Sequence, residues 1–151
     1  MKDTSPSPHP GTGAPFVGNV ILIDDMPFRR AQLKAFLQTW SDQVHLPVIG
    51  IDAAQVTSVD TAIMVILSLG PALFGKPQAS LLGEIKTRLP DVPIVVLAES
   101  VDTANIQAAF ELGVRGYIPS TSEPNVALSA LTFVLEGGHY FPPGTLMNES
   151  V

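Results

Sequence analysis

From Asn19 onward, short apolar runs alternate with segments in which apolar residues recur at helical spacing. The apolar runs predict buried strands, and continuous apolar strands are typical of a sheet covered on both faces. Strands that alternate with helices connect through right-handed crossovers, which makes the sheet parallel. The sequence therefore predicts one α/β domain with a doubly wound, five-stranded parallel sheet.

The expected strands are residues 20–23, 44–51, 62–67, 94–97 and 116–119. Pro47 weakens the second strand or places it at an edge of the sheet. Helical spacing is clear over residues 28–37, 81–89, 106–112 and 126–135. The short stretch between the second and third strands leaves room for only a weak helix.

Both ends of the chain differ in composition from the middle. Residues 1–18 are rich in Ser, Pro, Gly and Thr, so they bury too little apolar surface to offset the entropy of ordering. We expect a flexible tail over residues 1–18, a folded domain over residues 19–146, and the start of a linker or C-terminal tail over residues 147–151. The tail lacks the apolar core of a signal peptide and no window is long enough to span a membrane, which favours a cytoplasmic protein.

Composition excludes several classes of function. The net charge of −6 disfavours direct binding to nucleic acid or to an anionic membrane. The absence of cysteine excludes disulfides and thiolate chemistry, and the three histidines are scattered without metal-ligand spacing. Hydrophobic residues make up 46% of the chain and charged residues only 15%, which favours a protein with an apolar interaction surface.

Five residues lie at the carboxyl ends of the predicted strands: Asp24, Asp25, Ser68, Ala98 and Ser120. Ligands of open parallel sheets bind at this edge, near the point where the strand order reverses. We therefore expect these five residues to form one pocket.

Four segments stand in the order and at the spacing of a known family: ILIDDMP at residues 21–27, VILSL at 65–69, PIVVLA at 93–98, and residues 113–120. Together they resemble the receiver domain of bacterial response regulators. A further segment, EGGHYFPP at residues 136–143, resembles the end of the receiver in LuxR-type transcription regulators. The resemblance covers residues 19–146 and implies a flavodoxin-like sheet with strand order 2-1-3-4-5 and a role in two-component signal transduction and phosphorelay.

The resemblance also implies a phosphorylation pocket, and the chain departs from it at three positions. Ser68, Ala98 and Ser120 replace the acceptor aspartate, a hydroxyl residue and a lysine, whereas the acid pair Asp24 and Asp25 is retained. An acyl phosphate requires a carboxylate acceptor, and Ser68 has no obvious base beside it. Asp24 and Asp25 would hold Mg²⁺ weakly at best, and the alternative is that they cap the following helix.

We therefore expect a pseudo-receiver, which is a regulatory domain and not an enzyme, and which acts independently of phosphorylation. It would act through protein–protein contact, as a homodimer or with another signalling protein, and would control a LuxR-type DNA-binding domain absent from this chain. The resemblance implies an interface over residues 102–135, or one formed by residues 28–39 and 124–135. Glu99 and Tyr117 are the expected switch or interface residues, Tyr117 standing where the family has an aromatic residue that rotates on activation.

Two alternatives stay open at this point. The first is a small-molecule-sensing module that uses the emptied pocket or a helix interface, although the arginines are dispersed in the sequence and form no phosphate-binding cluster. The second is a phospho-receiver with a non-standard acidic acceptor, for which Asp60 and Glu99 are the candidates.

Overall fold

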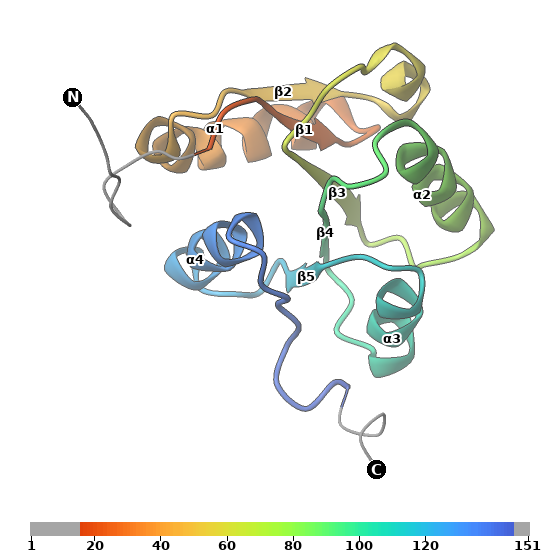
Figure 1. Ribbon diagram of the computed structural model, residues 1–151. Helices are drawn as coiled ribbons and strands as arrows, with labels where there is room; N and C mark the ends of the chain where they lie inside the picture. Colours follow the sequence, from red (N-terminus) through yellow and green to blue (C-terminus); the bar gives the residue numbers. More distant parts are fainter. Residues whose placement is uncertain (1–15, 147–151) are drawn as a thin grey trace.

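The computed structural model describes residues 16–146, and the predictions for residues 1–15 and 147–151 lie outside this range. The elements in chain order are β1 (Val20–Ile23), α1 (Pro27–Val44), β2 (Val48–Ile51), the 3₁₀ helix η1 (Ala53–Ser58), β3 (Met64–Gly70), α2 (Lys76–Arg88), β4 (Ile94–Ala98), α3 (Thr103–Glu111), β5 (Gly116–Pro119) and α4 (Pro124–Leu135). The strands form one sheet with the order β2-β1-β3-β4-β5, and every pair is parallel (Figure 1). The predicted fold class and strand order are thus confirmed.

The sheet has a separate hydrophobic core on each of its two faces. On one face, Ile21 and Ile23 of β1 pack with apolar side chains of η1, α2 and α3. On the other face, Val20 and Leu22 pack with apolar side chains of α1 and α4. Successive residues of a strand point to opposite faces, which is why every residue of β1 has to be apolar.

Helix α1 and helix α4 lie side by side over the second of these faces. The indole Nε1 of Trp40 in α1 donates a hydrogen bond to the Oγ1 of Thr132 in α4, at 3.0 Å. Trp40 is itself buried in the core beneath both helices. This pairing sets the spacing of the two helices along one side of the candidate site.

The predicted boundary between the first helix and the second strand was wrong. Helix α1 continues to Val44 and ends at His45, whose φ of 59° is left-handed. The Ser41 hydroxyl donates to the carbonyl of Leu46 at 2.6 Å and fixes the turn that follows the helix. Strand β2 therefore begins only at Val48, after Pro47.

Two further elements differ from the prediction. Strand β3 starts at Met64 and extends to Gly70, so Ser68 lies inside the strand and not at its end. The weak second helix is the 3₁₀ helix η1, which begins with a capping box between Asp52 and Gln55. A short 3₁₀ segment fits the few residues between β2 and β3 better than an α-helix, because it rises further per residue.

Contacts near the ends of the described range extend the core and the sheet. Phe16, which falls within the predicted tail, packs against the core beneath α1 and α4. Tyr140 bonds to the outer edge of β5, since the Tyr117 N–H donates to the Tyr140 carbonyl at 2.8 Å and the Tyr140 N–H donates to the Arg115 carbonyl at 3.0 Å. Within residues 16–146, no helix has the length and apolar character needed to cross a membrane.

Candidate functional site

The sheet brings the five predicted residues to one edge, where Asp25 lines a cavity together with Asp24 and Ser68. Asp24 follows β1, Ser68 lies near the end of β3, Ala98 ends β4, and Ser120 follows β5. The Ser120 N–H donates to the Ala98 carbonyl at 2.8 Å, and the Ser68 hydroxyl donates to the Asp24 carboxylate at 2.6 Å. The topology thus gathers these residues as expected for the carboxyl ends of parallel strands.

Asp24 is the centre of the site, and both of its carboxylate oxygens are engaged. Oδ1 accepts from the Met26 N–H at 2.9 Å and from Arg29 Nη2 at 2.8 Å. Oδ2 accepts from Arg29 Nε at 2.6 Å and from the Ser68 hydroxyl at 2.6 Å. The pair with Arg29 is therefore bidentate, the geometry in which a guanidinium binds a carboxylate best. Arg30 adds a hydrogen bond from Nη1 to the Asp24 carbonyl at 2.6 Å.

These contacts keep Asp24 ionised although its side chain is fully buried. Burial opposes ionisation of Asp24, but the hydrogen bonds from Arg29, Ser68 and the Met26 N–H outweigh it and hold the pKa below its ordinary value. The hydrogen bonds to Asp24 likewise raise the pKa of Arg29, against the effect of its partial burial. Arg29 is thus a permanent cation within the site.

The Arg29 side chain also passes close to the end of β3. Its guanidinium lies so close to Gly70 that a Cβ at this position would overlap it. Gly70 also has a φ of 58°, a conformation that glycine adopts far more readily than other residues. Strand β3 has an irregularity between Ser68 and Gly70 in its pairing with β4, so the chain bends where the arginine passes.

Asp25 does not cap the helix that follows it. Its Oδ1 accepts from the N–H of Ala53, the first residue of η1, at 2.7 Å. The N-cap of α1 is Met26, which makes no side-chain capping bond, although Asp24 accepts its backbone N–H. The two carboxylates therefore hold different segments: Asp24 holds the start of α1, and Asp25 holds the start of η1.

The acid pair does not fit a Mg²⁺ ion as it is arranged here. Mg²⁺ requires free oxygen ligands in near-octahedral geometry. Four donors already occupy the Asp24 carboxylate, Asp25 accepts from the backbone, and Ser68 contributes no carboxylate. Among residues 16–146, no three or more His, Cys, Asp or Glu residues are grouped as a metal would require.

Ser68 has a carboxylate beside it, contrary to the expectation that no base is near. The neighbour is Asp24, but an Asp24 carboxylate paired with Arg29 and with a lowered pKa is a poor acceptor for the serine proton. Ser68 is also buried. Its hydroxyl therefore serves as a fourth donor to Asp24 and not as a nucleophile.

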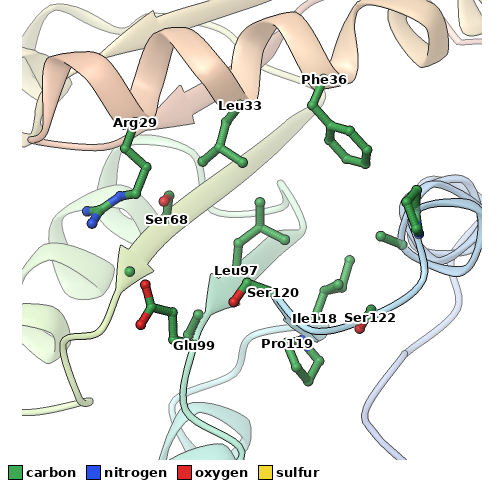
Figure 2. A pocket seen from close by; sticks show the side chains of 14 residues that line it. Arg29, Leu33, Phe36, Ser68, Leu97, Glu99, Ile118, Pro119, Ser120 and Ser122 are labelled. Atoms are coloured by element: carbon green, nitrogen blue, oxygen red, sulfur yellow. The ribbon is translucent and has the colours of Figure 1, made fainter.

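Two cavities flank the Arg29 side chain, and Arg29 and Ser68 line both of them. One has a volume of about 280 Å³ and is also lined by Asp24 and Asp25. The other, of about 320 Å³, lies on the side of α1 and α4 and is also lined by Ala98 and Ser120 (Figure 2). The arginine thus divides the strand-end pocket into an acidic part and a mainly apolar part.

Glu99 and Asp60, the two candidates for a non-standard phosphoryl acceptor, lie in different places. Glu99 directly follows β4 and lines the larger cavity, with its carboxylate at the same end as Arg29 (Figure 2). Asp60 precedes β3, so it lies toward the opposite edge of the sheet. The structure therefore brings Glu99 to the site and leaves Asp60 outside it.

Tyr117 is buried and belongs to a hydrogen-bond network that includes Asn105, a residue that sequence reasoning missed. The Tyr117 hydroxyl donates to the Ser100 carbonyl at 2.8 Å and accepts from Asn105 Nδ2 at 2.8 Å. Asn105 Oδ1 accepts from the Phe74 N–H at 2.5 Å. Burial raises the pKa of Tyr117, against the effect of these hydrogen bonds. The network ties β5, α3 and the loops after β3 and β4 together.

No protein-family model and no curated protein matches this chain. It is similar to a solved LuxR family DNA-binding response regulator from Silicibacter pomeroyi, with 24% identity over 83% of this chain and 98% of that chain and a TM-score of 0.66. It is similar to the isolated REC domain of RcsB from Salmonella enterica serovar Typhimurium, with 22% identity over 87% of this chain and 96% of that chain and a TM-score of 0.65.

A putative pilus assembly-related protein from Burkholderia pseudomallei has the same fold, with 14% identity over 80% of this chain and 90% of that chain and a TM-score of 0.66. RcsB has also been solved in a complex with DNA and as two dimers bound to two parallel DNAs. The chain thus has the fold of response-regulator receiver domains. At these identities the likeness defines the fold, and the role has to be argued from the site.

Proposed function

We propose that this chain is a signalling receiver domain that works without phosphorylation and acts through contacts with other proteins. The observation that carries the proposal is the bidentate Arg29–Asp24 pair, completed by Ser68. A guanidinium occupies the carboxylate that a divalent cation would need, and the acceptor position holds a hydroxyl. The occupied cation site and the missing acceptor carboxylate both argue against formation of an acyl phosphate at this position.

The same contacts favour a domain with one fixed conformation. Arg29 and Ser68 join α1 and β3 through Asp24, and Asn105 and Tyr117 join α3 and β5. Ala98 lacks the hydroxyl through which the resemblance would couple a phosphoryl group to Tyr117. The output of such a domain is set by what it binds and not by a covalent modification.

Helix α4 supports a role in protein–protein contact. Its twelve residues include no charged side chain, and Val126 and Phe133 are 45% and 50% exposed. An uncharged helix with exposed apolar side chains fits an interface. Because both interfaces expected from the sequence include this helix, we infer a homodimer in which α4 takes part. We further infer, from the resemblance to LuxR-type regulators, a role in controlling a LuxR-type DNA-binding domain.

The first test is intact-mass analysis after incubation with Mg²⁺ and acetyl phosphate, with an ordinary receiver domain as the positive control. We expect no added phosphoryl group on this chain under conditions that modify the control. A stoichiometric adduct would overturn the proposal, and peptide mapping would then identify the acceptor. Glu99→Gln serves as a second sample, because loss of an adduct in this variant would assign the modification to Glu99.

A further inference from the structure

The cavity of about 320 Å³ lies between α1, the ends of β4 and β5, and the start of α4 (Figure 2). Its volume is at the lower end of the range of small-molecule sites. Ala98 and Ser120 are small residues at two positions where the resemblance implies larger or more polar side chains, and both border the cavity. Small side chains at these two positions leave room for the cavity.

Most of the cavity wall is apolar. Leu33 and Phe36 project from α1, Leu97 and Ile118 come from the two strands, and Ala127 comes from α4. Leu97 is the one residue of β4 that is not buried, and Phe36 is 39% exposed. Leaving these side chains in contact with water is unfavourable, so the wall favours an apolar ligand body.

The charged residues lie at one end of the cavity: Figure 2 shows Arg29, Ser68 and Glu99 there, Ser120 beside Leu97, and Phe36 and Ser122 toward the other end. Arg29 directs two of its five N–H donors to Asp24, and Ser68 donates its hydroxyl proton to the same carboxylate. Within residues 16–146, the Glu99 carboxylate has no hydrogen-bonded or ion-paired side chain. Glu99 is therefore the acidic group at this end that is available to a ligand.

Among the residues that line this cavity, Arg29 is the one cation and Glu99 the one acid, and the charge of Arg29 is already balanced by Asp24 behind it. A phosphate or carboxylate would meet an arginine whose charge Asp24 already balances, and it would approach the Glu99 carboxylate. A cation would meet Glu99 directly. The charges thus select against nucleotides and other anions.

We propose that this cavity binds a small, mainly apolar primary amine. Its ammonium group donates hydrogen bonds to Glu99, and its apolar body lies between Leu33 and Phe36 on one side and Leu97 and Ile118 on the other. Such a ligand would contact α1, the sheet and α4 together, and so could regulate the surface formed by α4. The proposal goes beyond the phosphorylation-independent function and does not depend on it.

The test compares three probes with one apolar body: phenethylamine, 2-phenylethanol and phenylacetate. Binding to the whole chain is followed by amide chemical shifts and by thermal stability up to millimolar concentrations, since a ligand of the native state raises stability by mass action. We expect saturable shifts around the cavity with phenethylamine, weaker shifts with the alcohol, and none with phenylacetate. Methylammonium chloride at equal concentration controls for binding of a bare cation.

Three variants assign the site. Glu99→Gln should weaken phenethylamine binding about tenfold. Ser120→Trp should fill the cavity and abolish binding, whereas Thr121→Trp, an exposed neighbour that does not line the cavity, should bind as the unaltered chain does. Stability measured without probe shows that each variant is folded.

Several results would overturn the proposal. They are no saturable binding of phenethylamine, tighter binding of phenylacetate, equal binding to the unaltered chain and to Ser120→Trp, or equal binding to the unaltered chain and to Glu99→Gln. The phosphoryl-adduct assay measures covalent modification and the probe titration measures ligand binding, so the outcome of one does not decide the outcome of the other.

Discussion

Arg29 reaches Asp24 from the first turns of α1 and carries the positive charge that a buried carboxylate needs. The side chain of Asp24 is inaccessible to solvent, whereas that of Arg29 is 30% exposed. Removing a partner of a buried carboxylate costs more than the hydrogen bonds alone, because the remaining charge has lost its compensation. The pair therefore contributes to folding as well as to the chemistry of the site.

We expect Arg29→Ala to lower the free energy of unfolding by about 1–3 kcal/mol, since Asp24 keeps only Ser68 and the Met26 N–H as donors. Urea unfolding followed by circular dichroism measures the change. Lys34→Ala, at an exposed position of the same helix, is the control and should change stability by no more than about 0.5 kcal/mol. Equal stabilities of the two variants would contradict a structural role for the pair.

The low pKa of Asp24 predicts how stability depends on pH. Between the folded pKa and the ordinary value of about 4, the unfolded chain binds more protons, so stability rises with pH in this window. The contribution is complete above about pH 5 and is lost as the pH falls through the folded pKa. Urea midpoints between pH 7 and pH 2 should fall less steeply in Asp24→Asn than in the unaltered chain. Asp42→Asn, at an exposed position, should keep the full slope, and an unchanged slope in Asp24→Asn would exclude this group as the source.

The convergence of the site residues could be predicted from the sequence, but their chemistry could not. Asp24, Ser68, Ala98 and Ser120 meet because parallel strands end at one edge, and this follows from the order of apolar runs alone. The contact between Arg29 and Asp24 was not predicted, because it depends on the direction of a long side chain across the turn from β1 to α1. The sequence did contain a signal for this contact: Arg29 lies within two helical turns of the acid pair Asp24 and Asp25, in a chain that lacks the lysine and acceptor aspartate implied by the resemblance.

At the scale of elements, the end of β3 is shaped by Gly70 so that the arginine can pass. A Cβ at Gly70 would overlap the Arg29 guanidinium, and the φ of 58° is unfavourable for alanine. We expect Gly70→Ala to displace Arg29 from Asp24 and to lower stability by more than about 1 kcal/mol. Thermal and urea unfolding measure the loss.

Gly83→Ala is the matched control, because a Cβ at Gly83 in α2 meets nothing within 4 Å. This change should raise stability by about 0.4–1 kcal/mol through the lower entropy of the unfolded chain and the better helix propensity of alanine. Opposite signs for the two glycines are the expected outcome. A Gly70→Ala variant as stable as the unaltered chain would show that Arg29 has room to move aside.

The prediction of elements succeeded where a run was apolar on both faces and failed where local bonds set the boundary. The cores of β1, β3, β4 and β5 could be predicted because short, continuous apolar runs that alternate with helical segments are typical of a sheet covered on both faces. The end of α1 depends on His45 in a left-handed conformation and on the Ser41 hydroxyl, which apolar periodicity does not report. The 3₁₀ helix η1 likewise depends on the Asp52 capping box.

At the scale of the whole molecule, the proposed homodimer depends on the surface of α4. We expect light scattering to give twice the chain mass of 16.0 kDa at micromolar concentration. Val126→Glu should shift the mass to that of one chain, because a charge within an apolar interface is costly to desolvate. Ile49→Glu, at an exposed apolar position on the opposite edge of the sheet, should remain dimeric. A single-chain mass for the unaltered protein would contradict the proposed homodimer.

The bond between Tyr140 and β5 has a consequence for the kind of partner that this domain can accept. An open edge strand offers unpaired backbone groups to which another chain can add as a further strand. At β5 the Tyr117 N–H is already taken by Tyr140, and Pro119 has no N–H to offer. At the other edge, β2 has only four residues and follows Pro47. Strand addition is thus discouraged at both ends of the sheet, which favours recognition through helix side chains, whose identity can change without disturbing the sheet beneath them.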